Sequence, residues 1–202
     1  INDSVGRYNL YLVMNYQNDV YSAVLDKLDP NKTMLLDFGK FAKDKFAYVC
    51  QGFDQTLYDC MNDGADLFKK YKGIVLVYPE TSEHPQSCIP YFEKFCNDHS
   101  LDYRIVQQLH DDDINPNYAY FIIRHTDLVG FIKSVRRKGL TLGEDIGLLS
   151  YNDEPIFEII ENGITVISTD FTRMGVLAAN FILNHEKIQT YVPTQLIKRG
   201  SL

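Results

Sequence analysis

GEDIGLLSYNDEPIFEIIENGITVISTDFTRMG, residues 143–175, contains two apolar runs at 146–150 and 164–168. Each run breaks abruptly into polar residues. Short apolar runs with such bounds predict β-strands, and in open α/β sheets ligands bind just beyond the carboxyl ends of strands. The polar residues after the two runs are therefore the first candidates for a binding site.

The same alternation continues through the rest of the chain. Apolar runs predict further strands at 9–14, 33–36, 46–50, 74–78, 102–106, 119–123 and about 195–199. Helical spacing predicts helices at 20–28, about 55–71, 86–99, 128–138 and 172–183, and a short helical turn near 155–160. The alternation implies an α/β fold with parallel, right-handed βαβ units and helices on both faces of a sheet.

Composition and charge narrow the class of protein. The 202 residues allow one large domain or two small ones. The net charge of −7 argues against binding to a nucleic-acid backbone. The four cysteines lack metal or redox spacing, which favours buried thiols in a reducing compartment. There is no signal peptide, and no apolar run approaches the roughly 20 residues of a membrane span. We therefore expect a cytoplasmic protein without membrane contact.

Motifs of common enzymes are absent. The sequence has no GxSxG, P-loop or HExxH pattern, and no GxGxxG follows a strand. The five histidines are dispersed, so no metal site is expected. We predict a protein that is not an enzyme and uses no cofactor or metal.

Several segments carry recognisable motifs: 70–96 (KYKGIVLVYPETSEHPQSCIPYFEKFC), 119–135 (AYFIIRHTDLVGFIKSV), 143–155 (GEDIGLLSYNDEP), 161–183 (ENGITVISTDFTRMGVLAANFIL) and 193–202 (PTQLIKRGSL). In this order they resemble the effector-binding domain of the lactose/galactose repressor family. The YND and ISTDF sequences and the helix start at His84-Pro85 resemble a subgroup in which this domain follows a GntR-type winged helix.

The resemblance implies a periplasmic-binding-protein-like fold of type I, with two Rossmann-like lobes and a sugar between them. The chain would cross between the lobes three times. Residues 1–72 and 168–190 would form the first lobe, and 73–167 and 191–202 the second. The resemblance also implies an N-terminally truncated chain, with an incomplete first lobe and a DNA-binding domain missing before it.

A sugar site needs carboxylates and amides that pair with hydroxyls. Asn152 lies where the family has the first Asp of a pair, and an amide both donates and accepts hydrogen bonds. We expect it to contact the ligand; the alternative is a turn Asn that bonds its own backbone. Asp153 matches the second Asp and is expected to brace the loop.

The second polar break adds three residues. Thr169 matches a position that commonly faces the pocket in the family. Phe171 matches a ring that packs on the ligand, while its place at the start of an amphipathic helix predicts plain core equally well. Asp170 is expected to be the N-cap of that helix rather than a ligand contact.

The family's Asn-Asp pair is replaced by Thr126-Asp127. Thr126 keeps one hydroxyl for the sugar, and the neighbouring His125 is an alternative contact. Asp127 is expected to cap a helix that starts at residue 128. The ligand-binding Arg of the family falls near Cys88, which cannot make a bidentate contact, and this argues against an acidic sugar or phosphosugar.

Two weaker candidate positions follow strands of the first lobe. Either Gln51 or Asp54 replaces the Asp that follows the family's third strand there, and Asn15 and Tyr16 follow the strand at 9–14. Together these residues predict the sugar-sensing domain of a dimeric transcription regulator, which touches DNA only through the missing domain. The alternative is a sugar-binding protein of an ABC-type uptake system, which shares the two-lobed architecture.

Overall fold

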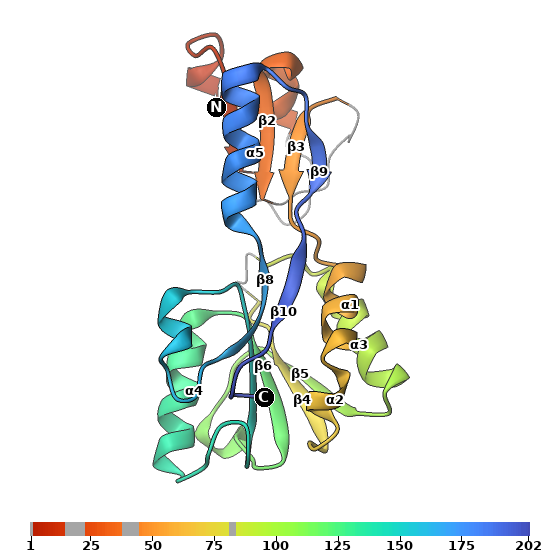
Figure 1. The fold of residues 1–202 in the computed structure, drawn as a ribbon, viewed down its shortest axis with the longest axis vertical. Helices are drawn as coiled ribbons and strands as arrows, with labels where there is room; N and C mark the ends of the chain where they lie inside the picture. The colour runs from red at the N-terminus through yellow and green to blue at the C-terminus, as the bar shows by residue number, and fades with distance from the viewer. Residues whose placement is uncertain (1, 15–22, 38–44, 81–83) are drawn as a thin grey trace. The chain divides into compact units, whose positions relative to one another are not determined.

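The structure is a computed structural model that describes residues 2–14, 23–37, 45–80 and 84–202. It divides into two compact units: unit 1 comprises Ile1–Gly52 and Thr169–Pro193, and unit 2 comprises Phe53–Ser168 and Thr194–Leu202. Each unit contains a sheet of predominantly parallel strands with helices packed on it (Figure 1). The predicted α/β class is confirmed.

Unit 1 is built on a four-stranded sheet of order β1-β2-β3-β9. Its elements are β1 (Tyr11–Met14), β2 (Thr33–Asp37), β3 (Ala47–Cys50), β9 (Gln189–Tyr191), α5 (Phe171–Asn184) and the 3₁₀ helices η1 (Asn2–Ser4), η2 (Ala23–Lys27) and η3 (Pro30–Lys32). Of the predicted helix at 20–28, residues 20–22 lie outside the described part of the chain, and the remainder includes η2. The strand β9 was not predicted from the sequence.

The sheet of unit 1 is apolar on both faces, because successive side chains of a strand point to opposite sides. In β2, Met34 joins the cluster under α5, which includes Phe181. Its neighbour Leu35 joins the cluster on the other face, which includes Leu25 of η2. Covering both faces explains why residues 34–36 are all apolar.

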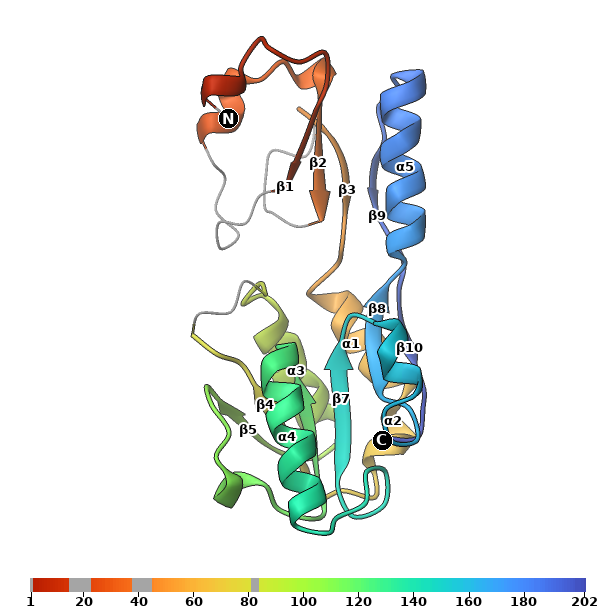
Figure 2. The same cartoon turned by 90° about the vertical axis from the view of Figure 1, so that its left-hand side faces the viewer.

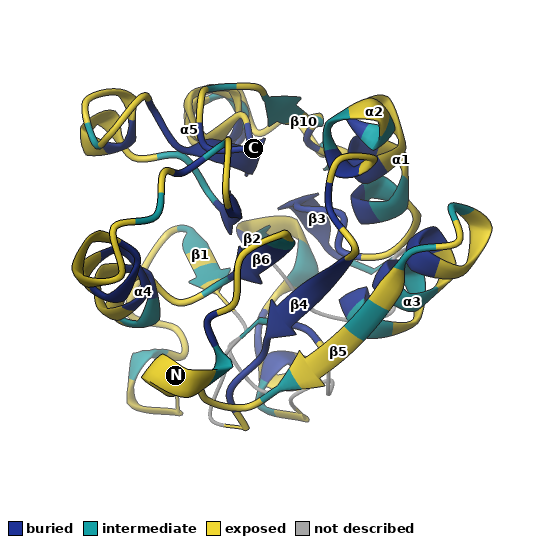
Figure 3. Ribbon diagram, turned by 90° about the horizontal axis from the view of Figure 1, so that it is seen from below, coloured by how far each residue is buried: buried dark blue, intermediate teal, exposed yellow. Residues whose placement is uncertain are grey.

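Unit 2 is built on a six-stranded sheet of order β10-β8-β7-β6-β4-β5. Its strands are β4 (Gly73–Val77), β5 (Asp102–Val106), β6 (Tyr118–Ile122), β7 (Gly147–Tyr151), β8 (Thr165–Thr169) and β10 (Thr194–Ile197). Its helices are α1 (Gln55–Asp63), α2 (Ala65–Phe68), α3 (Cys88–Asp98), α4 (His125–Arg137), η4 (Asp111–Asp113) and η5 (Pro155–Glu158). The helices α1 and α3 lie on one face of the sheet and α4 lies on the other (Figure 3).

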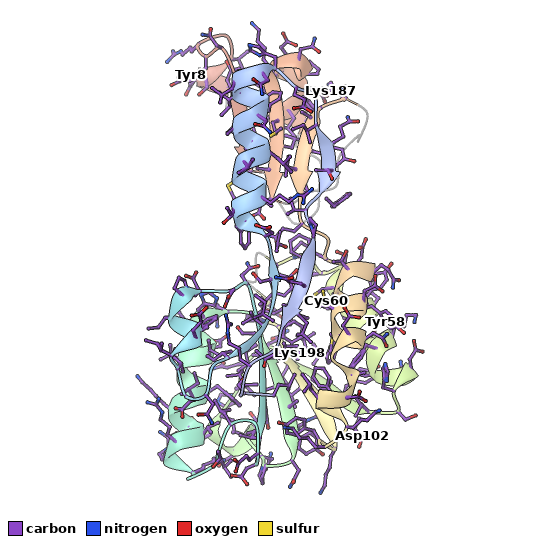
Figure 4. The ribbon with its side chains drawn as sticks, in the orientation of Figure 1. Tyr8, Tyr58, Cys60, Asp102, Lys187 and Lys198 are labelled. Atoms are coloured by element: carbon purple, nitrogen blue, oxygen red, sulfur yellow. The ribbon has the colours of Figure 1, made fainter. Side chains whose placement is uncertain are left out.

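The segment 53–72, which the sequence analysis placed in the first lobe, packs within unit 2. The Tyr58 hydroxyl of α1 donates a hydrogen bond to Asp98 of α3 at 2.9 Å. The Lys198 ammonium donates to the carbonyl oxygen of Asp63 at 2.8 Å. Figure 4 labels Tyr58 on α1 and Lys198 beyond β10. These contacts tie α1 to α3 and to the C-terminal segment, so the division between the units falls at Gly52.

The predicted single helix at 55–71 is broken at Gly64, between α1 and α2. A Cβ atom at Gly64 would lie 2.3 Å from Cδ2 of Leu196 in β10. Glycine therefore lets β10 approach the helix pair closely. No helix in the described part of the chain is long and apolar enough to cross a membrane, and all four cysteine thiols are buried, as expected.

Candidate functional site

Asn152 follows the carboxyl end of β7 in unit 2. Its φ of 61° places the backbone in the left-handed region, which Asn tolerates better than most residues. Its backbone N–H donates to the Ile167 carbonyl at 2.8 Å, which fixes the residue against β8. The side-chain Oδ1 is buried and accepts no hydrogen bond from any residue that the structure describes. It is therefore an acceptor ready for a ligand donor.

Asp153 holds the loop that carries Asn152. Both of its carboxylate oxygens accept hydrogen bonds from the Arg199 guanidinium, at 2.7 and 2.8 Å. Its backbone N–H donates to the Ser168 hydroxyl at 3.0 Å, and Arg199 also donates to the Ile164 carbonyl at 2.9 Å. The hydrogen bond to Asp153 raises the pKa of Arg199. Asp153 thus joins the ends of β7 and β8 to the C-terminal segment.

A group of aromatic rings adjoins Asn152 and was missed in the sequence. The His84 ring lies 4.5 Å from that of Tyr151 and 4.9 Å from that of Phe53, measured between centroids. The Tyr78 hydroxyl donates to the His84 carbonyl. Burial lowers the pKa of His84 to about 3, so the ring is neutral at neutral pH. The only signal in the sequence was the aromatic residues at strand ends.

The predicted contacts in segment 125–127 lie in the first turn of α4, which begins at His125 and not at residue 128. Asp127 is therefore inside the helix instead of capping it. Its carboxylate accepts two hydrogen bonds from Arg124, at 2.9 and 2.8 Å. The exposed Thr126 lines a cavity beside α4, and the His125 ring packs edge-on against Phe157 at 5.3 Å.

In unit 1, strand ends bring three polar side chains together. The Thr169 hydroxyl donates to Oε1 of Gln51 at 2.9 Å, and both residues are buried. The Nε2 of Gln51 donates to Oδ1 of Asp37. Burial raises the pKa of Asp37, and the hydrogen bond from Gln51 acts in the opposite direction. Asp37 directly follows the predicted strand at 33–36. Its place beside Gln51 follows from the pairing of β2 with β3.

The start of α5 shows what Asp170 and Phe171 each do. Asp170 is the N-cap, and its carboxylate accepts a hydrogen bond from the Arg173 backbone N–H at 2.8 Å. Phe171 is the first residue of the helix and its side chain is 42% exposed. A ring this exposed is not part of the core of unit 1, which leaves its face open to a ligand.

The remaining predicted residues are not part of these groups. Asp54 is exposed at the start of α1 in unit 2, whereas Gln51 lies in unit 1. Asn15 and Tyr16 lie outside the described residues. Within the described ranges, no three His, Cys, Asp or Glu side chains are placed to hold a metal ion. Unit 2 thus offers an amide acceptor beside aromatic rings, and unit 1 offers amide, hydroxyl and carboxylate groups.

Comparison with known families identifies the class of protein. Residues 69–202 match the periplasmic binding protein-like domain family. This match covers more than half of the chain, which therefore belongs to that family. No curated protein sequence matches the chain significantly.

Solved structures of transcription regulators share the fold. A LacI family regulator from Bifidobacterium animalis subsp. lactis is 17% identical with a TM-score of 0.78, over 99% of this chain and 80% of that one. A regulator of this family from Weissella paramesenteroides, with bound glucose, is 19% identical with a TM-score of 0.74 (100% and 80% covered). Another from Enterococcus faecium, with bound ribose, is 17% identical with a TM-score of 0.72 (94% and 78% covered).

Proposed function

We propose that this chain is the ligand-sensing domain of a cytoplasmic transcription regulator, and that a small sugar binds to the residues at its strand ends. The buried Oδ1 of Asn152, which no described residue bonds, carries the proposal. Leaving such an atom unpaired costs about 1–3 kcal/mol. A sugar hydroxyl would remove this cost by donating to it, which also supports selectivity for hydroxylated ligands.

The polar groups of unit 1 support a neutral sugar. Asp37 accepts a hydrogen bond from Gln51 through Oδ1, and its carboxylate has further capacity to accept from sugar hydroxyls. Thr169 and Gln51 hold this carboxylate in position. Cys88, near the place of the family's ligand-binding Arg, offers no bidentate partner for an acidic sugar. Phe171, exposed at the start of α5, would cover the C–H face of the ring.

The proposed mechanism is a linkage between two binding events. Thr169 lies where the chain passes from unit 2 to unit 1, so sugar binding at this residue would favour one arrangement of the connecting segment. A DNA-binding domain outside this sequence, of the GntR winged-helix type, would respond to that arrangement in a homodimer. Sugar and DNA affinities are then coupled reciprocally. The proposal assigns no catalytic residue.

A thermal-shift panel tests the proposal. The panel would contain glucose, ribose, galactose and other neutral sugars, with glucose 6-phosphate as an anionic comparison. A sugar present at 100 times its Kd stabilises the native state by about 2.7 kcal/mol, which raises the Tm of a domain of this size by several degrees. At least one neutral sugar is expected to give this shift. Unchanged Tm values with every neutral sugar would reject sugar sensing.

A further inference from the structure

Unit 2 contains a cavity of about 550 Å³ beside α4. Its walls come from the residues after β4, from the connection between β5 and β6, and from one side of α4. Its apolar lining consists of the half-buried Leu109 and the buried side chains of Ile114 and Phe131, and the other walls are mainly polar. The cavity lies within the described part of a single unit and shares Thr126 with the candidate site.

The sequence of the β5–β6 connection explains why this space exists. Parallel strands are usually joined by a helix that covers the sheet, and α4 does this between β6 and β7. Between β5 and β6 the chain forms only the three-residue η4, which Figure 2 shows to the left of the lower end of α4. On the facing side of α4, Gly130 borders the cavity, and a Cβ atom there would meet nothing within 4 Å.

The charges around the cavity disfavour an anionic ligand. Three carboxylates line it, those of Glu80, Asp111 and Asp127. Asp111 is paired with the neighbouring Arg137, and the lining itself holds one guanidinium, that of Arg124. This guanidinium is already bound in bidentate fashion by Asp127. A phosphate or carboxylate ligand needs hydrogen-bond donors, and this part of the cavity presents mainly hydrogen-bond acceptors.

The same walls suit a hydroxylated neutral ligand. Each carboxylate already accepts hydrogen bonds from the protein: Glu80 from Gln107, Asp111 from Ser134 and Arg137, and Asp127 from Arg124. Their remaining lone pairs can accept from ligand hydroxyls, while Gln108 and Thr126 can donate and accept. The half-buried Leu109 offers apolar surface for the C–H face of a sugar. The volume is in the range of pockets for drug-sized ligands, and so exceeds the need of one sugar ring.

We propose that the cavity beside α4 binds a neutral oligosaccharide, with at least one sugar ring seated against Gly130. This inference rests on the proposed function and names the ligand class: a di- or trisaccharide in place of a single sugar. The ring seated here adds affinity to the contacts at the strand ends.

Gly130→Leu tests the cavity directly, because the added side chain would occupy it. The matched control is Gly175→Leu in α5 of unit 1, where a Cβ atom also meets nothing within 4 Å. Both changes remove a glycine from a helix interior, so both should raise the Tm of the unliganded protein to a similar extent. Gly130→Ala adds a smaller side chain at the same position and so fills less of the cavity.

Binding would be measured by calorimetry with glucose, galactose, maltose, lactose, cellobiose, maltotriose and raffinose. We expect one di- or trisaccharide to bind at least ten-fold more tightly than its component monosaccharide. Gly130→Leu should remove that gain, Gly130→Ala should reduce it, and Gly175→Leu should leave it intact. The oligosaccharide proposal fails if a monosaccharide binds as tightly as any longer sugar. It also fails if Gly130→Leu leaves the affinity for the longer sugar unchanged. In both cases the proposed function itself would stand. Absence of binding by every sugar would overturn the proposed function together with the oligosaccharide proposal.

Discussion

Asp153 and Arg199 form a bidentate ion pair with donor–acceptor distances of 2.7 and 2.8 Å, although they are far apart in the sequence. Their side chains are 25% and 14% exposed. The pair joins the loop after β7 to the segment after β10, and it lies next to Asn152. The position of the proposed ligand acceptor thus depends on a contact made by the last few residues of the chain.

Asp153→Asn should lower the free energy of unfolding by about 2 kcal/mol, because a charge-assisted hydrogen bond is lost and the partly buried charge of Arg199 loses its bidentate partner. Denaturant unfolding measures this. Asp66→Asn is the control, since its ion pair with Lys69 is exposed to solvent and should not contribute measurably. Equal stability of the two variants would show that the Asp153–Arg199 pair does not brace the loop.

Asp170→Ala should destabilise the protein by about 1 kcal/mol through loss of the N-cap of α5. Asp170→Ser should retain most of the stability, because a serine hydroxyl can also accept from the Arg173 N–H. Thermal unfolding of the two variants compares them. If Ala and Ser destabilise equally, the side chain of Asp170 acts through something other than capping.

Asp37→Asn should stabilise the protein at neutral pH and weaken sugar binding. Burial raises the pKa of Asp37, so the folded state holds this proton more tightly than the unfolded state does. The stability associated with the protonated form is present at low pH and is lost as pH rises through the folded pKa. The gain from Asp37→Asn should therefore be largest at pH 7 and shrink towards pH 3.

Denaturation at several pH values, with Asp112→Asn as an exposed control, separates this effect from a general change in net charge. A gain that does not depend on pH would contradict the assignment to Asp37.

His84 should make the protein less stable in acid. Burial lowers its pKa from 6.5 to about 3 in the folded state, so between these values the unfolded state binds more protons. Stability from the neutral ring is complete above pH 6.5 and is lost as pH falls towards 3, with a slope of up to about 1.4 kcal/mol per pH unit. His84→Gln should flatten the dependence of unfolding free energy on pH in this window.

His185→Asn is the control for His84→Gln, because His185 is exposed. Its pH profile should match that of the wild type. A profile for His84→Gln that is as steep as that of the wild type would assign the acid sensitivity to other groups.

Most strands could be predicted from the sequence because apolar runs covered on both faces give a strong local signal. The strand β9 could not, since Gln189–Tyr191 is short, largely exposed and defined by its pairing with β3. The start of α4 was misplaced because Asp127 resembles an N-cap, whereas it pairs with Arg124 from within the first turn. The strand β9 and the start of α4 are thus both determined by contacts that the local sequence pattern does not reveal.

Residues of the candidate site could be predicted only where they directly follow an apolar run in the sequence. Asn152 and Thr169 directly follow apolar runs, so both were singled out. Asp37 was not, because its closeness to Gln51 depends on which strands are neighbours in the sheet. His84 gave no separable signal, since its ring contacts come from residues 53 and 151 of the sequence.

Asn152→Gly tests the central claim most directly, with Asn117→Gly as the matched control. Both asparagines have positive φ, of 61° and 65°, so glycine relieves the same backbone strain at each, and Asn117 precedes β6 instead of following a strand. Calorimetric titration with the sugar that gives the largest thermal shift should show binding by wild type and by Asn117→Gly, and at least ten-fold weaker binding by Asn152→Gly. Equal affinity of the three proteins would contradict the assignment of Asn152 as the ligand acceptor.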